Sequence, residues 1–302
     1  MSIAATIQLC TYNRAHLLPR VLDACFEQNV PPGTYEVVLV DDGSTDATAA
    51  AIEAARRRAR VPFTAISQAN AGLARGRNAG IAASAGDRII FVDDDILPMP
   101  NFVEEHLREA AAGRDLVVRG AVIEVESFDR LPPPFWTLRD YSANWFWTSN
   151  VSASRTALNA VRLREGEWFD ESFSEYGWED IELGLRLRES GIRAVFNKKA
   201  LVYHYKPKAA RAPELESILR QKRAQARTAR VLARKHPTWR VRLATGDNGV
   251  QRGLHRLSRA LGLPRGWNAA LRHPALRRFA LAALASDAYF DELERESVTR
   301  EA

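Results

Sequence analysis

Cysteine is scarce in this chain of 302 residues, which contains only Cys10 and Cys25. Two cysteines at this spacing provide neither a disulfide framework nor the paired thiolates of a structural zinc site. We therefore expect both to be reduced packing residues in a cytoplasmic protein. The chain also begins without a basic segment followed by an apolar one, which argues against a cleaved secretory signal.

Long hydrophobic runs are missing as well. The longest candidate membrane segment, residues 279–285, is far shorter than the roughly 20 apolar residues that a spanning helix needs. No low-complexity tract, internal repeat, zinc finger, helix-turn-helix or RNA-binding signature is apparent. These absences argue against a membrane-spanning protein and against nucleic acid as a partner.

The net charge of +6 is divided unevenly along the chain. Residues 206–302 carry 21 Lys and Arg but 9 Asp and Glu, whereas the rest carries 22 and 28. This split predicts two parts, an α/β domain over residues 1–205 and a basic helical region over residues 206–302. For the basic region three alternatives stay open: a cap or oligomer contact, a peripheral contact with the inner face of a membrane, and, least favoured, nucleic acid.

Strand-like and helical patterns alternate in the first part. Apolar runs over residues 3–10, 35–40, 63–67, 88–92 and 116–125 predict strands, and helical apolar spacing covers residues 16–28, 70–84 and 101–112. This alternation predicts an α/β fold with a mostly parallel sheet flanked by helices. Later, short strands are expected over 148–152, 194–196 and 201–203, and three basic helices after Pro207, at about 215–236, 254–261 and 271–284.

The central strand of this pattern ends in three carboxylates, Asp93, Asp94 and Asp95. Open α/β sheets bind their ligands at the carboxyl ends of the strands. Adjacent carboxylates repel each other unless a cation or strong donors face them, and clustered oxygens suit Mg²⁺ or Mn²⁺. The run therefore suggests a metal–diphosphate site, with a solvated acidic turn as the alternative.

Together with this triplet, six further motifs resemble the family 2 inverting nucleotide-sugar glycosyltransferases, whose fold is of the GT-A type. The resemblance covers about residues 3–205 and leaves the tail outside. The matching pieces, in the family's order, are Thr11-Tyr12-Asn13-Arg14, Asp41-Asp42-Gly43-Ser44, Asn70-Ala71-Gly72 with Arg77-Asn78-Ala79-Gly80, Asp93-Asp94-Asp95, Phe169-Asp170-Glu171, Trp178-Glu179-Asp180-Ile181-Glu182-Leu183, and His204.

The resemblance implies a nucleoside-diphosphate sugar as donor, with a UDP-sugar expected, and Mn²⁺ or Mg²⁺ as cofactor. Asp95 and His204 would ligate the metal, and Asp93 would face the ribose, whereas the role of Asp94 stays open. Considered alone, His204 is more typical of a surface or packing histidine. A metal ion there would stabilise the charge that develops on the leaving diphosphate.

Other motifs would bind the nucleotide. Asp42 would bond the uracil ring with Asp41 supporting the loop, and helix capping is the alternative for both residues. Arg77 would reach the base or the diphosphate, and Arg75 competes with it because two helix positions point about 200° apart. The loop after the first strand would contact the nucleotide-sugar through Thr11, Tyr12, Asn13 and Arg14.

The acceptor side is expected to be a hydroxyl of a glycan or glycolipid. Within the family pattern Asp180 is the general base and Glu179 binds an acceptor hydroxyl, with capping of the helix start as the alternative for both. Aromatic side chains suit the C–H faces of sugar rings, although core packing explains them equally well. The candidate acceptor residues are Trp136, Trp145, Trp147, Trp178 and Asn150.

Two rival functions stay open. A catalytically silent nucleotide-sugar-binding scaffold would not need Asp93, Asp95, Asp180 and His204 together. A nucleotidyltransferase also uses a metal and a parallel sheet, but it usually carries a glycine-rich basic signature after the first strand, where this chain has no glycine. Besides donor and acceptor, a second copy of the chain is a candidate partner.

Overall fold

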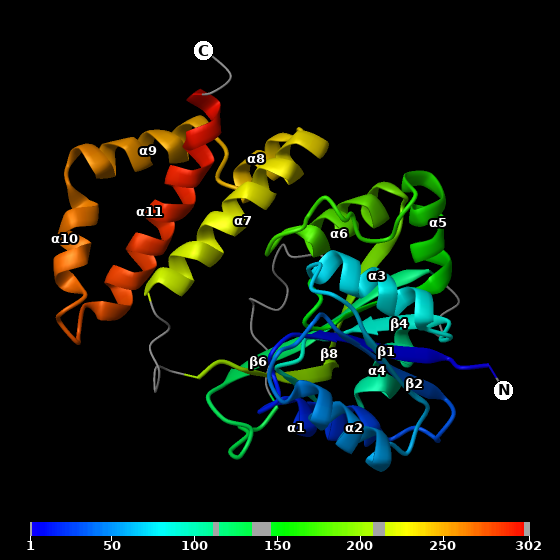
Figure 1. Ribbon diagram of the computed structural model, residues 1–302. Helices are drawn as coiled ribbons and strands as arrows, with labels where there is room; N and C mark the ends of the chain where they lie inside the picture. The colour runs from blue at the N-terminus through cyan, green and yellow to red at the C-terminus, as the bar shows by residue number, and fades with distance from the viewer. Residues whose placement is uncertain (1, 111–114, 135–145, 208–214, 299–302) are drawn as a thin grey trace. The chain divides into compact units, whose positions relative to one another are not determined.

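A computed structural model describes residues 2–110, 115–134, 146–207 and 215–298 (Figure 1). By packing, the chain divides into two compact units. The first unit contains Met1–Glu171 and Glu179–Lys208, and the second contains Ser172–Trp178 and Ala209–Ala302. The segment 172–178 therefore packs with the helical second unit although it lies between two helices of the first.

The first unit is built on one eight-stranded sheet with the strand order β3-β2-β1-β4-β7-β6-β8-β5. Strands β1 to β4 are parallel, β7 is antiparallel to both β4 and β6, and β6 and β8 are parallel. The mostly parallel α/β fold expected from the sequence is confirmed. The elements are β1 (Ala5–Thr11), α1 (Leu18–Phe26), β2 (Tyr35–Asp41), α2 (Thr48–Arg58), β3 (Phe63–Ser67), α3 (Leu73–Ala83), β4 (Arg88–Phe91), β5 (Ile96–Pro98), α4 (Phe102–Ala110), β6 (Leu116–Val125), β7 (Val151–Ser154), α5 (Arg155–Glu165), α6 (Glu179–Glu189) and β8 (Arg193–Tyr205).

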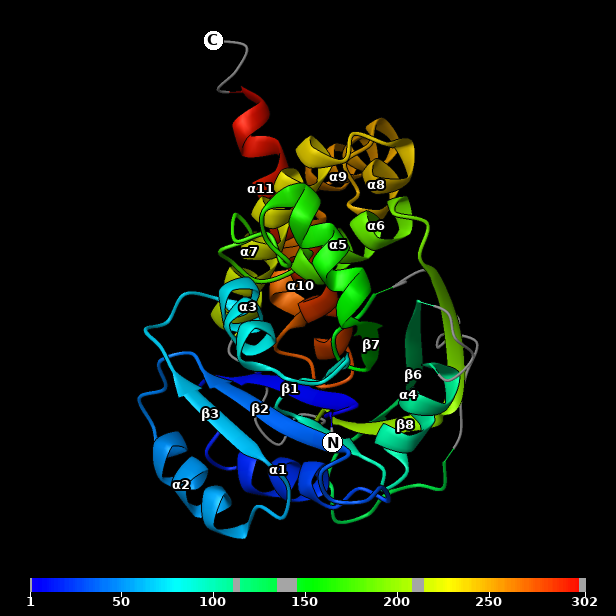
Figure 2. The same ribbon diagram turned by 90° about the vertical axis from the view of Figure 1, so that its right-hand side faces the viewer.

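Two hydrophobic cores lie on opposite faces of the sheet (Figure 2). On one face β1 and β2 pack against α1, α2 and α4, and on the other β4 and β7 pack against α3, α5 and α6. Strands β1, β2 and β4 are buried along their whole length, because helices cover both faces. The apolar runs in β2 and β4 therefore lack the alternation of a half-exposed strand, whereas β1 places the buried polar residues Thr6 and Gln8 between apolar ones.

Three details of the first unit differ from the sequence pattern. Residues 193–205 form the single strand β8 instead of two short strands, and β7 begins at Val151 instead of Thr148. Helix α5 was not anticipated, since it buries only Ala157, Leu158 and Val161 among polar residues. Its start is stabilised by the Ser154 hydroxyl, which accepts a hydrogen bond from the Ala157 amide at 3.0 Å.

The second unit is helical, with α7 (Leu215–Lys235), α8 (Trp239–Ala244), α9 (Gly249–Ala260), α10 (Leu263–Ala270) and α11 (Arg277–Val298). The sequence predicted three helices here. Residues 271–276, which include Pro274, separate α10 from α11, so the third expected helix begins at Arg277 instead of residue 271. The short helices α8 and α10 were not predicted. Helices α7 and α11 share a small core of Ala226, Ala229 and Leu293. Within the described ranges, no helix combines the length and apolar character required to cross a membrane.

Candidate active site

The polar residues singled out in the sequence lie at the carboxyl ends of neighbouring parallel strands. Thr11 ends β1 and pairs in register with Asp41 at the end of β2, and Asp93 follows β4 on the other side of β1. The sheet thus brings three distant motifs to one edge. This is the edge at which open α/β sheets bind ligands.

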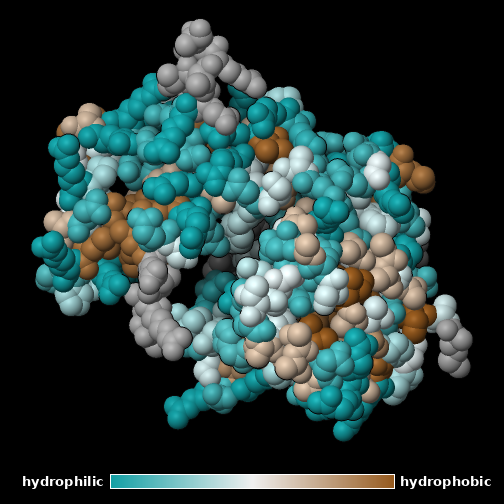
Figure 3. All heavy atoms as spheres, viewed as in Figure 1, coloured by the Kyte–Doolittle hydropathy of each residue, from teal (hydrophilic) through white to brown (hydrophobic). Residues whose placement is uncertain are grey.

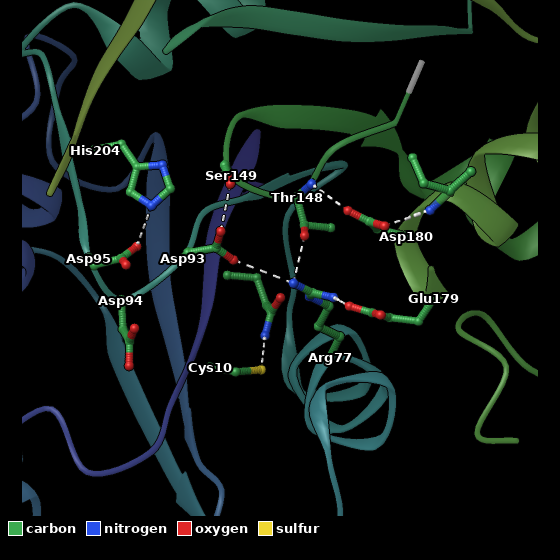
Figure 4. Close-up of polar contacts among 12 residues, drawn as sticks. Cys10, Arg77, Asp93, Asp94, Asp95, Thr148, Ser149, Glu179, Asp180 and His204 are labelled. Atoms are coloured by element: carbon green, nitrogen blue, oxygen red, sulfur yellow. Dashed lines mark hydrogen bonds and ion pairs between the residues drawn. The ribbon is translucent and has the colours of Figure 1, made fainter. Parts of the chain in front are cut away.

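Asp95 lies against His204. The antiparallel pairing of β5 and β8 sets Ile96 opposite His204, and the histidine Nε2 donates to Asp95 Oδ1 at 3.1 Å (Figure 4). Burial alone would raise the pKa of Asp95, but the hydrogen bond and charge of His204, with Lys206 4.0 Å away, hold it below its usual value. Asp95 is therefore an anion at neutral pH.

This pair fits a divalent cation. Neighbouring ligands of an octahedral Mg²⁺ stand about 3 Å apart, close to the separation of Asp95 Oδ1 and His204 Nε2. The other histidine nitrogen, Nδ1, is buried and bonds to nothing within the described ranges. Among the described residues no three His, Cys, Asp or Glu side chains converge on one point. A metal held here would therefore need further oxygens from a phosphate or water, as Mg²⁺ commonly does.

Asp94 is turned toward the loop after β1. Its Oδ2 accepts from the Thr11 hydroxyl at 2.7 Å, and its Oδ1 lies 3.5 Å from Arg14 Nε. Burial raises the pKa of Asp94 to about 6, although Thr11 and Arg14 act in the opposite direction. Thr11 and Arg14, both predicted to contact the nucleotide, therefore also fix this carboxylate.

Arg77 joins the aspartate triplet to α6. Its guanidinium donates to Glu179 Oε1 at 2.6 Å and to the Thr148 hydroxyl at 2.5 Å, and lies 3.4 Å from Asp93 Oδ1. Asp93 Oδ2 in turn accepts from the Ser149 hydroxyl at 2.6 Å. Figure 4 shows Arg77 between the two carboxylates. Because its side chain is only 6% exposed, Arg77 is placed to organise these groups, and its predicted contact with the nucleotide stays a prediction.

Two glycines allow α3 to carry Arg77 so close to the sheet. A Cβ atom at Gly80 would lie 2.4 Å from Gln8 Nε2, and one at Gly76 would lie 3.1 Å from Cys10 Sγ. The two glycines are four residues apart and so share one side of the helix. This side faces β1, where a larger residue would meet the side chain of Gln8 or Cys10. Arg75, the alternative to Arg77, is exposed.

Glu179 and Asp180 open α6. Glu179 is buried, and its Oε2 contacts no hydrogen-bond partner within the described ranges. Asp180 is partly buried and accepts from the amides of Ile181 at 2.7 Å and Thr148 at 3.4 Å. Burial, followed by the charge of Glu179, raises the pKa of Asp180 to about 7, whereas Arg77 lowers it. A carboxyl group in this state is suited to accept a proton near neutral pH.

The remaining predicted nucleotide residues hold loops together. Asp42 accepts from the amides of Ala71 and Gly72 at 3.0 and 2.9 Å, so it fixes the loop before α3. Asp41 accepts from the Ser44 amide at 3.0 Å. Both carboxylates therefore support loops, but neither caps a helix, because the N-cap residues of α2 and α3 are Ala47 and Gly72 and neither helix start has a side-chain cap. Contact with a base stays a prediction.

In the loop after β1, Asn13 also holds a neighbouring loop in place. Asn13 has a left-handed backbone, with φ of 55°, and its side-chain oxygen accepts from the Thr45 amide at 2.7 Å. The neighbouring Tyr12 is 48% exposed. Tyr12 is thus the residue of this loop that offers a free aromatic surface.

The predicted acceptor residues have diverse surroundings. Trp136 and Trp145 lie outside the described residues, and Trp147 is partly buried. Asn150 is buried and donates to the carbonyls of Ala121 and Ala200, both at 2.9 Å, so it bridges strands instead of lining a surface. Trp178 belongs to the helical unit, where its Nε1 donates to the Gln225 carbonyl at 3.0 Å.

Thr148 and Ser149 were not recognised as site residues from the sequence. They contact Arg77 and Asp93, respectively, and are almost fully buried. The only sequence signal is a pair of hydroxyl side chains just before a strand. That signal has no specificity until the antiparallel pairing of β7 with β4 places it beside the aspartates.

Comparison with known proteins shows that the chain is similar to glycosyltransferases. Validoxylamine A glucosyltransferase of Streptomyces hygroscopicus subsp. limoneus is 29% identical over 231 residues, which cover 65% of this chain and 50% of the relative. The chain spans about half the length of the curated relatives it matches first.

Solved structures share the fold. The mannosyltransferase PcManGT of Pyrobaculum calidifontis, in complex with GDP-Man and Mn²⁺, superimposes with a TM-score of 0.64 at 18% identity, over 99% of this chain and 88% of that one. The Staphylococcus aureus protein TarS, residues 1–349 in complex with UDP, gives a TM-score of 0.54 at 17% identity, over 98% and 92%. The sequence also matches the family described as Glycosyl transferase family 2 over residues 6–168, more than half of its length, and the chain therefore belongs to glycosyl transferase family 2.

Proposed function

We propose that this protein is a metal-dependent, inverting hexosyltransferase that moves a sugar from a nucleoside diphosphate, UDP in the first instance, to a hydroxyl of a glycan or glycolipid. The observation that carries the proposal is the shared position of Arg77. It bonds Glu179 beside the candidate base and lies 3.4 Å from Asp93 in the candidate metal–diphosphate motif. The buried guanidinium of Arg77 thereby contacts both Asp93 on the proposed donor side and Glu179 on the proposed acceptor side.

At the donor end, Asp95 and His204 would hold Mn²⁺ or Mg²⁺. A divalent cation supplies Lewis-acid stabilisation of the negative charge on the departing diphosphate. To bind a metal through Nε2, His204 would release the proton that it shares with Asp95, and the chain would then offer two adjacent ligands that leave other positions open for phosphate oxygens. The solved complexes of PcManGT with GDP-Man and Mn²⁺ and of TarS with UDP support this type of donor.

At the acceptor end, Asp180 would take the proton from the attacking hydroxyl. The new bond joins that oxygen to the anomeric carbon while the bond from the anomeric carbon to the diphosphate oxygen breaks. Attack from the face opposite the leaving group inverts the anomeric centre, so no enzyme nucleophile is needed. The raised pKa of Asp180 favours proton uptake, since a base works best near the operating pH.

Glu179 would orient the acceptor hydroxyl. Its Oε1 accepts a hydrogen bond from Arg77, and its Oε2 has no hydrogen-bond partner within the described ranges. A hydroxyl donating to Oε2 would satisfy this oxygen. The relative named validoxylamine A glucosyltransferase supports a carbohydrate-like acceptor.

The test combines donor binding with turnover. UDP-glucose, UDP-N-acetylglucosamine and GDP-mannose are titrated by calorimetry with Mn²⁺, Mg²⁺ or EDTA, and released nucleoside diphosphate is measured with glycan acceptors. Asp95→Asn is expected to remove the Mn²⁺ dependence of binding and to lower turnover by about 10²-fold or more, because several kcal/mol of charge stabilisation are lost.

Glu53→Gln, a change at an exposed carboxylate on α2, is the matched control and should leave both measurements unchanged. Normal turnover of Asp95→Asn would contradict the metal assignment. Donor binding without any turnover in the native protein, over a broad set of acceptors, would favour the silent scaffold instead.

A further inference from the structure

Helix α9 carries its apolar side chains on the side that faces away from its own unit. Residues at spacings of four, three and four share one narrow side of a helix, and here that side is entirely aliphatic. Such a stripe normally packs into a core. In α9 and the residue after it the stripe is 55–74% exposed, and it consists of Val250, Leu254, Leu257 and Leu261.

The polar side of α9 makes the contacts with α11 instead. His255 is buried, with its ring 5.5 Å from that of Phe290 and its Nδ1 3.6 Å from Asp287. Arg256 lies 3.1 Å from Glu294, also on α11. The usual order of an amphipathic helix, apolar inside and charged outside, is therefore reversed.

Further exposed apolar residues follow α9 along the chain. Leu263 at the start of α10, Leu276 just before α11 and Phe279 within it are 46%, 44% and 65% exposed. Figure 3 shows apolar side chains gathered on the helical unit in the region of α10 and α11. Together with the α9 stripe these residues form the α9–α11 surface. Groups of exposed apolar side chains on a folded unit mark candidate interaction sites.

The charge around this surface has one sign. Residues 248–286 contain seven arginines and neither aspartate nor glutamate. Three of these arginines, 252, 256 and 259, pair with acidic residues outside that range. The other four have no acidic partner within the described ranges, and they are Arg265, Arg272, Arg277 and Arg278.

We propose that the α9–α11 surface docks on an anionic phospholipid bilayer. The aliphatic and aromatic side chains would enter the boundary between head groups and acyl chains, and the four arginines without acidic partners would contact lipid phosphates. Basic residues combined with an exposed leucine and phenylalanine face are the chemistry of helices that lie in a membrane interface. Each basic residue close to an anionic leaflet strengthens binding by roughly fivefold.

The charge pattern disfavours two other occupants. A twofold contact between identical copies would set the same four arginines against themselves, with no acidic residue between positions 248 and 286 to offset them. Nucleic acid would match the arginines but would leave the leucine stripe in water. A bilayer matches both features.

The test is flotation of the full chain with vesicles of phosphatidylcholine, either alone or with about one third phosphatidylglycerol. Donor and acceptor are left out, so the result does not depend on the proposed glycosyl transfer. The native protein is expected to float with anionic vesicles at low salt and to be released by high salt. The double variants Leu254→Ser/Leu257→Ser and Arg277→Gln/Arg278→Gln should each weaken binding by about tenfold or more, because they remove inserted apolar side chains or phosphate contacts. All four side chains are exposed, so both variants should still fold.

Leu163→Ser on α5, where the leucine is 89% exposed, and Arg56→Gln/Arg57→Gln on α2 are the matched controls, and they should float like the native protein. Failure of the native protein to float with anionic vesicles would overturn the proposal. An equal loss in the controls would do the same. Concentration-dependent dimers that Leu254→Ser/Leu257→Ser abolishes, without flotation, would assign the surface to a second copy instead.

Discussion

Replacement of Arg77 by methionine tests whether this residue holds the site together. Arg77 and Glu179 are both almost fully buried and 2.6 Å apart. Removing one member of a buried ion pair costs about 3–5 kcal/mol, because the remaining charge has no compensation. For a unit of this size each kcal/mol lowers Tm by roughly 2–4 °C, so Arg77→Met is expected to lower it by about 6–20 °C.

A second substitution separates charge from packing. Glu179→Gln in the Arg77→Met background removes the uncompensated carboxylate, and much of the lost stability should return, since buried pairs are often replaceable by neutral groups. Arg75→Met, two positions away on the same helix but exposed, is the control and should change stability by about 0.5 kcal/mol or less. Scanning calorimetry of the four proteins at one pH gives the comparison.

Arg77→Met and a fifth protein, the single variant Glu179→Gln, are expected to change the pH profile in opposite directions. Arg77 lowers the pKa of Asp180 and Glu179 raises it. If Asp180 is the base, the acidic limb of kcat/KM should move to higher pH in Arg77→Met and to lower pH in Glu179→Gln. The reasoning is refuted if Arg77→Met melts within about 2 °C of the native protein, or if the double variant is no more stable than Arg77→Met. It is also refuted if the acidic limb moves in the same direction in Arg77→Met and in Glu179→Gln.

Four further predictions concern Asp180, Gly80 and Trp178. Asp180→Asn should lower turnover by roughly 10²–10⁴-fold with little change in donor affinity, and its rate profile should have no acidic limb near pH 7; near-normal turnover would leave Glu179 as the next candidate. The pKa of Asp180 is higher in the folded protein than in the unfolded chain, so its contribution to the free energy of unfolding is lost as pH rises from about 4 to about 7. Urea unfolding at both pH values should therefore show a smaller fall in stability for Asp180→Asn than for the native protein. Gly80→Ala should cost about 1–3 kcal/mol in the same assay, since the added methyl would meet Gln8, and a neutral result would show that α3 can move outward. Trp178→Phe should cost about 1 kcal/mol in the helical unit through the lost bond to Gln225, and an unchanged acceptor KM in this variant would count against an acceptor role for Trp178.

The sequence by itself determined the local elements and the family. Buried parallel strands have continuous apolar runs that can be recognised in the sequence, which is why β2 and β4 begin where the pattern predicted them. The motifs at strand ends were visible because each is a compact group of polar residues between two regular elements. Short or weakly amphipathic helices such as α5 and α8 were missed, since their few apolar residues give no clear period.

Only the tertiary structure decided which of these residues meet. The pairing of β5 with β8 brings His204 to Asp95 across more than a hundred residues, and the close approach of α3 to β1 buries Arg77 between Asp93 and Glu179. No local pattern reveals that Thr148 faces Arg77 or that the apolar stripe of α9 lies outside its unit. Periodicity fixes which side of a helix is apolar, but the direction in which that side points depends on what the rest of the chain packs against it.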